Sequence, residues 1–167
     1  MIYRFRAILD TQEDVFRDLE IQADATLEDF HNALTQAFGF AGQEMASFYI
    51  SNEQWEQGEE IALFDMSEQP GSLRIMEETT LDDIVHEDQT KLIYVYDFFN
   101  LWTFMVELAE ITEAEDGKSY PSLMFAHGNI PDEAPDKQFV ADKTDSEDAL
   151  DNDPDNFDQF DFDENWN

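Results

Sequence analysis

Residues 91–108 constrain the fold more than any other part of this 167-residue chain. They hold two dense apolar segments, and Phe99 and Asn100 between them predict a short turn. The first segment is apolar on both alternating faces, one with Ile93, Val95 and Asp97, the other with Leu92, Tyr94, Tyr96 and Phe98. Two apolar faces are typical of a strand covered on both sides. We therefore expect residues 91–98 to form the central strand and residues 101–111 to form its neighbour.

Asp97 is the polar exception at the end of this central strand. A buried carboxylate needs hydrogen-bond donors, and the amides of the turn that follows it are the nearest ones. We therefore interpret Asp97 as a structural residue rather than a catalytic one. Replacing it with alanine is predicted to cost ~1–3 kcal/mol, because the turn amides would lose their acceptor.

The N-terminal part predicts a β-hairpin followed by a helix. Residues 2–9 and 15–22 alternate apolar and polar side chains, and the short polar link between them favours antiparallel pairing. Thr26 and Asp29 have the spacing of a capping box, and apolar residues then recur at helical spacing as far as Gly39. His31 lies beside this apolar stripe, and we interpret it as a partly buried helix residue rather than a ligand or base.

The middle of the chain predicts short strands at residues 45–51 and 61–64. Residues 52–60 between them are polar and are expected to form a loop, with Trp55 folded back onto the core. A further strand is expected at residues 120–126.

Thr80 and Asp83 repeat the capping-box pattern and predict a second, shorter helix. On that helix Asp82 and His86 would lie one turn apart, as a surface pair rather than a metal site.

This order of elements predicts an α+β domain in which one main helix packs across a mixed sheet. The arrangement is similar to a β-grasp (ubiquitin-like) core extended by C-terminal strands. We expect this domain to span residues 1–133. An acidic tail at residues 134–167 follows, and it is too polar to fold alone.

The charge of the chain excludes several classes of function. With 41 acidic and eight basic residues the net charge is −33, so phosphates of DNA or RNA and anionic membrane surfaces would be repelled. No segment is long and apolar enough to cross a bilayer, and no signal-peptide pattern opens the sequence. The chain has no cysteine, which fits a reducing cytoplasm. We expect a cytoplasmic protein whose partners present basic surfaces.

Aromatic residues are interleaved with the acids of the tail. They are Phe157, Phe160, Phe162 and Trp166. Such a segment can insert aromatic side chains into a basic-rimmed groove of a partner, or add as a strand to a sheet edge. The alternative is a solvated, disordered tail, or one whose aromatic side chains fold back on their own domain.

The sequence predicts neither a catalytic set, a metal site nor a cofactor. The spacing of Asp151, Asp153 and Asp155 resembles the start of a calcium loop, but Asn156 and Phe162 stand where that loop needs Gly and Glu. No phosphate loop, dinucleotide fingerprint or nucleophile elbow occurs.

Residues 2–133 carry a family resemblance. The run Tyr94-Val95-Tyr96-Asp97-Phe98, followed by Trp102, is the sharpest match. Further matching segments are 2–5, 15–21, 25–31, 37–40, 80–83 and 106–108, with traces at 120–121 and 131–133. On these residues the chain resembles the plasmid pRiA4b ORF-three-like family, also described as an insertion-element passenger protein of TnpR type. The resemblance implies Tyr96, Asp97, Phe98, Asn100 and Trp102 as the family-motif positions.

The chain departs from the family pattern at three places. Phe99 and Asn100 replace the usual Gly-Asp, Phe104 replaces a His, and Ile130 precedes Pro131 where the family has a Cys. If those family residues form an active or metal site, the resemblance implies that this chain has lost it.

We therefore expect a non-enzymatic protein-interaction module, with a link to mobile genetic elements implied by the family. Two alternatives stay open. One is a degenerate metal-dependent hydrolase that uses residues near Asp97, Asn100 and the loop 127–133. The other is an acidic mimic of nucleic acid that binds a basic DNA-binding protein.

Overall fold

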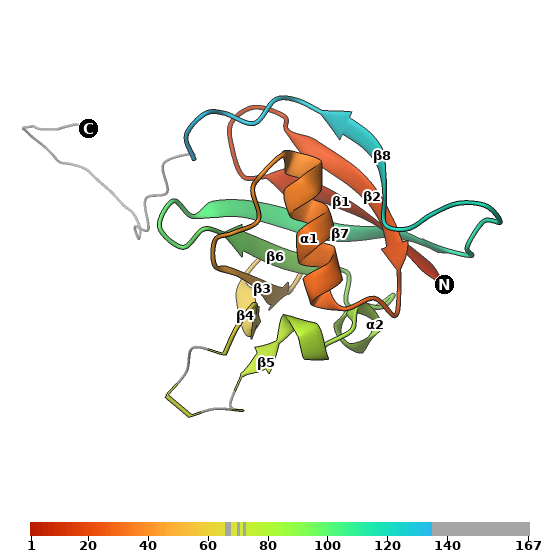
Figure 1. The fold of residues 1–167 in the computed structure, drawn as a ribbon, viewed down its shortest axis with the longest axis horizontal. Coiled ribbons are helices and arrows are strands. Elements are labelled where there is room, and N and C mark those ends of the chain that lie inside the picture. The colour runs from red at the N-terminus through yellow and green to blue at the C-terminus, as the bar shows by residue number, and fades with distance from the viewer. Residues whose placement is uncertain (66–67, 70, 72, 135–167) are drawn as a thin grey trace, which may run out of the picture. The chain divides into compact units, whose positions relative to one another are not determined.

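The computed structural model describes residues 1–65, 68, 69, 71 and 73–134, and these form an eight-stranded sheet with a helix across one face (Figure 1). The strands are β1 (Ile2–Leu9), β2 (Phe16–Gln22), β3 (Ala46–Ser51), β4 (Gln57–Ala62), β5 (Arg74–Ile75), β6 (Lys91–Tyr96), β7 (Trp102–Thr112) and β8 (Ser122–His127). The helices are α1 (Leu27–Phe38), the 3₁₀ turn η1 (Met76–Glu78) and the short α2 (Leu81–Ile84). The predicted α+β class with a mixed sheet is confirmed.

The sheet order is β5-β4-β3-β6-β7-β1-β2-β8. All neighbours run antiparallel except β4 and β5, which are parallel. β7 lies between β1 and β6, so the N-terminal hairpin of β1 and β2 reaches the rest of the sheet through β7. The β-grasp description of this core stays a prediction.

Helix α1 forms where its capping residues predict it. The Asp29 amide donates to Thr26 Oγ1 at 3.1 Å, the Thr26 amide donates to Asp29 Oδ2 at 3.2 Å, and Gly39 ends the helix with φ +84°. The apolar stripe of α1 packs on the sheet, where Phe30 stacks between Phe5 and Phe48 at ring distances of 4.6 and 5.5 Å. This aromatic stack is the centre of the core.

The N-termini of α1 and α2 bind each other reciprocally. The Leu27 amide donates to Thr79 O, and the Leu81 amide donates to Ala25 O, both at 2.9 Å. The first amide of each helix has no acceptor within its own helix, and it donates instead to the carbonyl of the residue that precedes the other helix's N-cap. Asp83 repeats the role of Asp29 by accepting from the Thr80 amide at 3.3 Å.

β6 lies inside the sheet, flanked by β3 and β7, and residues 92–96 are buried. Tyr94 and its same-face neighbours contribute to the core beneath α1. On the opposite face Ile93 and Val95 are shielded by cross-strand neighbours such as Tyr49 and Met105. We expected another element to cover this second face of β6. Among the described residues, side chains of neighbouring strands cover it instead.

Two predictions about the middle of the chain are wrong. The expected strand 61–64 is β4, which starts at Gln57 and ends at Ala62, so only residues 52–56 form the loop. The first half of β4 is exposed and polar, and its pairing with β3, not an apolar pattern, makes it a strand. His86 lies beyond the end of α2 and bridges to Gln89, because the chain becomes extended at Val85. It therefore does not face Asp82 across a helical turn.

Candidate functional site

The family-motif residues gather at the turn between β6 and β7, where Asp97 organises the backbone. Its Oδ1 accepts from the amides of Phe99 and Asn100 at 3.1 and 3.3 Å, and its Oδ2 accepts from Asn100 Nδ2 at 2.6 Å. Asp97 is 9% exposed and has φ +66°, a left-handed conformation that Asp tolerates better than most residues. The carboxylate is thus engaged in holding the turn.

Tyr96 and Trp102, at the two ends of this turn, pack into the core. The Tyr96 hydroxyl accepts from the Gly42 amide at 3.0 Å, and the Phe40 ring lies 4.8 Å from Tyr96 and 5.0 Å from Trp102. Phe98 and Asn100 are the members of the set that are exposed to solvent, Phe98 at 45%. These five residues therefore build a turn on an aromatic base.

Phe104 is part of the same aromatic base. It is fully buried, with its ring 4.6 Å from Phe38 and 5.7 Å from Tyr94. In the described ranges no three His, Asp or Glu side chains are arranged to hold a metal ion. The tail residues Phe157, Phe160, Phe162 and Trp166, like the candidate calcium-type spacing, lie outside the described residues.

His31 lies in the core rather than at the surface. It is 2% exposed, and its Nδ1 is 2.6 Å from the Tyr94 hydroxyl. Burial lowers the pKa of His31 and raises that of Tyr94 well above its usual value. Both groups are therefore neutral at pH 7 and act as a hydrogen-bonded core pair.

The basic side chains of the described residues are all engaged in hydrogen bonds or ion pairs. Residues 1–134 contain 29 acidic and six basic residues, a net charge of −23. Five of the six cations make ion pairs, and these are Arg4 with Glu20 and Glu110, Arg6 with Asp18, Arg74 with Glu59, Lys91 with Glu53 and Glu107, and Lys118 with Glu20 and Glu115. The described surface is consequently acidic and offers carboxylates without matching cations.

Arg17 is the sixth cation and is buried. It donates to backbone carbonyls only, with Nε 3.0 Å from Ala37 O and Nη1 at 2.8 Å from Phe16 O and 2.9 Å from His127 O. Burial lowers its pKa, but its three acceptors include a carbonyl at the C-terminal end of α1, where a cation is favoured. Arg17 thereby ties the end of α1 to the end of β8.

A buried carboxylate fixes the loop that leads into β8. The Glu20 side chain is 2% exposed, with Oε2 accepting from Arg4 Nε at 2.9 Å and Oε1 accepting from Lys118 Nζ at 2.6 Å. The hydrogen bond from Lys118, together with that from Arg4, lowers the pKa of Glu20. This triad anchors the loop before Pro121.

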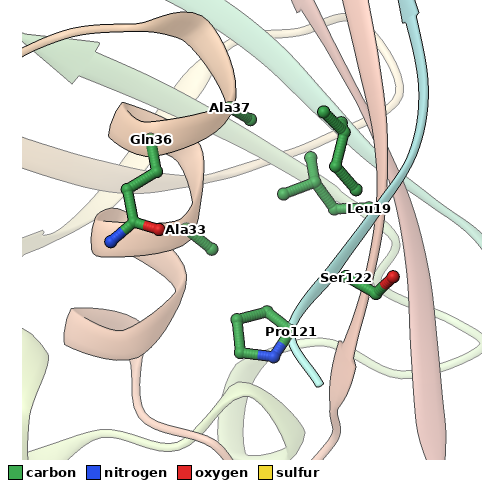
Figure 2. Close-up of a pocket in the computed structure, with 7 residues that line it drawn as sticks. Leu19, Ala33, Gln36, Ala37, Pro121 and Ser122 are labelled. Carbon is green, nitrogen blue, oxygen red and sulfur yellow. The ribbon is translucent and has the colours of Figure 1, made fainter. Parts of the chain in front are cut away.

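Between α1 and β8 the molecule has an apolar groove (Figure 2). Its volume is about 150 Å³, and its lining residues are Leu19, Ala33, Gln36, Ala37, Pro121, Ser122 and Leu123. Figure 2 shows Ala33 and Ala37 directed from the helix toward the strand side of the groove. A second hollow, of about 500 Å³, lies on the other face of the sheet between Arg4, Arg6, Asp18 and Glu107. Each of these charges is held in an ion pair, Arg6 with Asp18, Arg4 with Glu20 and Glu110, and Glu107 with Lys91.

Sequence reasoning did not single out the groove. The feature of the sequence that could have indicated the groove is the absence of charge. Residues 30–43 and 119–131 form the two longest runs without Asp, Glu, Lys or Arg in the chain. The first run contains most of the groove's helical wall, and the second contains β8.

Comparisons with known proteins place this geometry in a family. A family model described as plasmid pRiA4b ORF-3-like protein matches residues 1–165, a range that extends past the predicted resemblance and through most of the acidic tail. Among solved structures, the protein of unknown function MM3350 from Methanosarcina mazei Go1 has a TM-score of 0.68 at 19% identity, over 78% of this chain and 72% of that chain. At that identity the likeness shows a shared fold. No curated protein matches the chain.

Proposed function

Since the chain belongs to the plasmid pRiA4b ORF-3-like family, we propose that it is a non-enzymatic, cytoplasmic protein-interaction module for a partner with a basic surface. One observation carries the proposal. Six engaged cations among residues 1–134 leave 23 negative charges uncompensated on a folded domain. Such a field accelerates encounter with positively charged proteins and repels nucleic acids.

The residues at the family-motif turn support a structural role over a hydrolytic one. Asp97 accepts three hydrogen bonds within its own turn, and Asn100 donates two of them. A general base or metal ligand would need a lone pair directed at a substrate or ion. The family description refers to a plasmid open reading frame, and we extend the proposal to a role with a mobile genetic element.

The test is affinity capture with the immobilised full-length chain. We expect it to retain a basic protein that an unrelated acidic protein of similar net charge, on the same matrix, does not retain. Retention should fall as salt rises from ~0.1 M to ~1 M, because screening shortens the Debye length from ~10 Å to ~3 Å. Equal retention by the acidic control would reject a specific interaction module.

The same charge favours one second candidate, mimicry of nucleic acid. A mimic would capture a DNA-binding protein, and duplex DNA would compete for it. An interaction module would retain its partner in the presence of excess DNA. Competition by DNA therefore separates the two functions.

A further inference from the structure

β8 is an edge strand without the usual protection of an edge. It pairs with β2 on one side, and no other strand of the described residues lies on its far side (Figure 1). Edge strands are commonly blunted by charges, and none of the six residues of β8 is charged. Instead Leu123, Met124 and Phe125 are 49%, 42% and 53% exposed. Such a free edge is able to accept another strand.

The groove between α1 and β8 adjoins this edge. Leu123 borders both, since it lines the groove and lies on β8. The groove's volume of about 150 Å³ compares with cavities of ~150 Å³ that accept one benzene-sized group. One apolar side chain of an added strand therefore fits between the helix and the sheet.

Charge distinguishes this region from the rest of the molecule. The groove's walls come mainly from the two longest uncharged runs, residues 30–43 and 119–131, in a chain of which 29% is charged. The residues around them are overwhelmingly acidic, since residues 1–134 carry a net charge of −23. An apolar strip in an acidic field fits a ligand with an apolar centre and basic flanks.

We propose that an extended peptide segment of another protein, with alternating apolar residues flanked by Lys or Arg, adds to β8 as a further strand and places an apolar side chain in the groove. This inference rests on the proposed function and names its docking surface. Backbone hydrogen bonds to β8 supply affinity, and the groove supplies specificity, as in other cases of strand addition. A second copy of this chain is a poor occupant, because each copy brings a net charge of −33.

The test begins with a displayed library of random peptides selected on the full-length protein. We expect the selected peptides to share alternating apolar residues with basic flanks. The binding of one such peptide is then measured for the wild type, for Leu123→Glu and for Phe99→Glu. Leu123→Glu places a charge beside the groove and should weaken binding at least about tenfold. Phe99→Glu makes a matched change at a 92% exposed residue of the distant β6–β7 turn and should change binding less than about twofold.

Hydrogen exchange on the wild type tests the same contact without a mutation. The peptide should slow exchange of β8 amides by about tenfold or more, because their free edge becomes hydrogen-bonded. Protection confined to other strands would overturn the proposal even if Leu123→Glu fails to fold. A dimer of the wild type, detected by light scattering and dissociated by Leu123→Glu, would also overturn the proposal, because a second copy would then occupy the groove.

These results separate the docking surface from the proposed function. A basic partner captured equally by wild type and Leu123→Glu would leave the interaction module standing and reject the groove. A failure to capture any partner beyond the acidic control would reject the interaction module itself.

Discussion

At the scale of single residues, Asp97 shows how a polar group at a buried strand end determines the local backbone. Its three accepted hydrogen bonds close the turn, and its own amide donates to Met45 O at 2.7 Å, which links the turn to the start of β3. The residue was predictable from sequence because a carboxylate ending an apolar strand requires donors. Its positive φ was not, since that depends on the path of the following turn.

We expect Asp97→Ala to lower the free energy of unfolding by ~1–3 kcal/mol, because the two turn amides and the Asn100 side chain lose their acceptor. Asp97→Asn keeps an acceptor oxygen and tolerance of φ +66°, so its cost should be smaller. Urea unfolding at pH 7 measures both. Equal losses for the two variants would show that the carboxylate's hydrogen bonds are not the cause.

His31 predicts a dependence of stability on pH. Burial lowers its pKa in the folded state, so the unfolded chain binds a proton more readily. Its stabilising effect is therefore complete above the unfolded pKa of ~6.5 and is lost as the pH falls below that value. We expect the free energy of unfolding of His31→Gln to change less than that of the wild type between pH 7.5 and pH 5.5. Urea titrations at both pH values give the comparison, and parallel losses in the two proteins would contradict it.

At the scale of elements, the parts with a strong local signal were predictable. Alternation identified β1 and β2, and caps identified α1 and α2. β4 was misplaced because its exposed first half, residues 57–59, carries no apolar alternation. The order of the strands in the sheet could not be predicted from local sequence patterns. The position of β7 between β1 and β6 depends on pairing between strands that are distant in sequence. The groove was missed for the same reason, because its two walls lie about eighty residues apart in sequence.

The reciprocal helix N-termini predict coupling between two caps. Thr26→Ala should cost about 1 kcal/mol through the lost cap. Thr80→Ala should cost less, because the contact of its hydroxyl is with Asp82 Oδ1. The double variant should deviate from additivity by ~0.5 kcal/mol or more, since each helix start holds the other. Thermal unfolding of the double-mutant cycle tests this, with Thr26→Ala plus Thr103→Ala as the control that should be additive.

At the scale of the whole molecule, the acidic excess opposes folding through repulsion between like charges. Five of the six cations in the described part form ion pairs, but most of these pairs are partly exposed and contribute little stability. The apolar core and its aromatic stack must therefore outweigh the repulsion. Cations from solution can further reduce this repulsion by screening the carboxylates.

We accordingly expect sodium chloride to stabilise the protein. Raising the salt from ~0.01 M to ~1 M shortens the Debye length from ~30 Å to ~3 Å and should raise the free energy of unfolding by about 1 kcal/mol or more. Differential scanning calorimetry measures the Tm, and sodium sulfate at equal ionic strength separates screening from surface exclusion. A Tm that falls with chloride would mean that the ion pairs outweigh the repulsion.

The place of β1 in the sheet has a consequence for how the chain folds during synthesis. Ile2 is opposite Gln22 on one side and opposite Thr112 on the other. The first hairpin therefore emerges early, but its second neighbour exists only after two thirds of the chain has been made. Such long-range closure slows folding, because loop entropy is lost before the contacts form. Until then the N-terminal hairpin and α1 can cover only each other, and the rest of their apolar faces stays exposed. This is therefore the stage at which a chaperone would be needed.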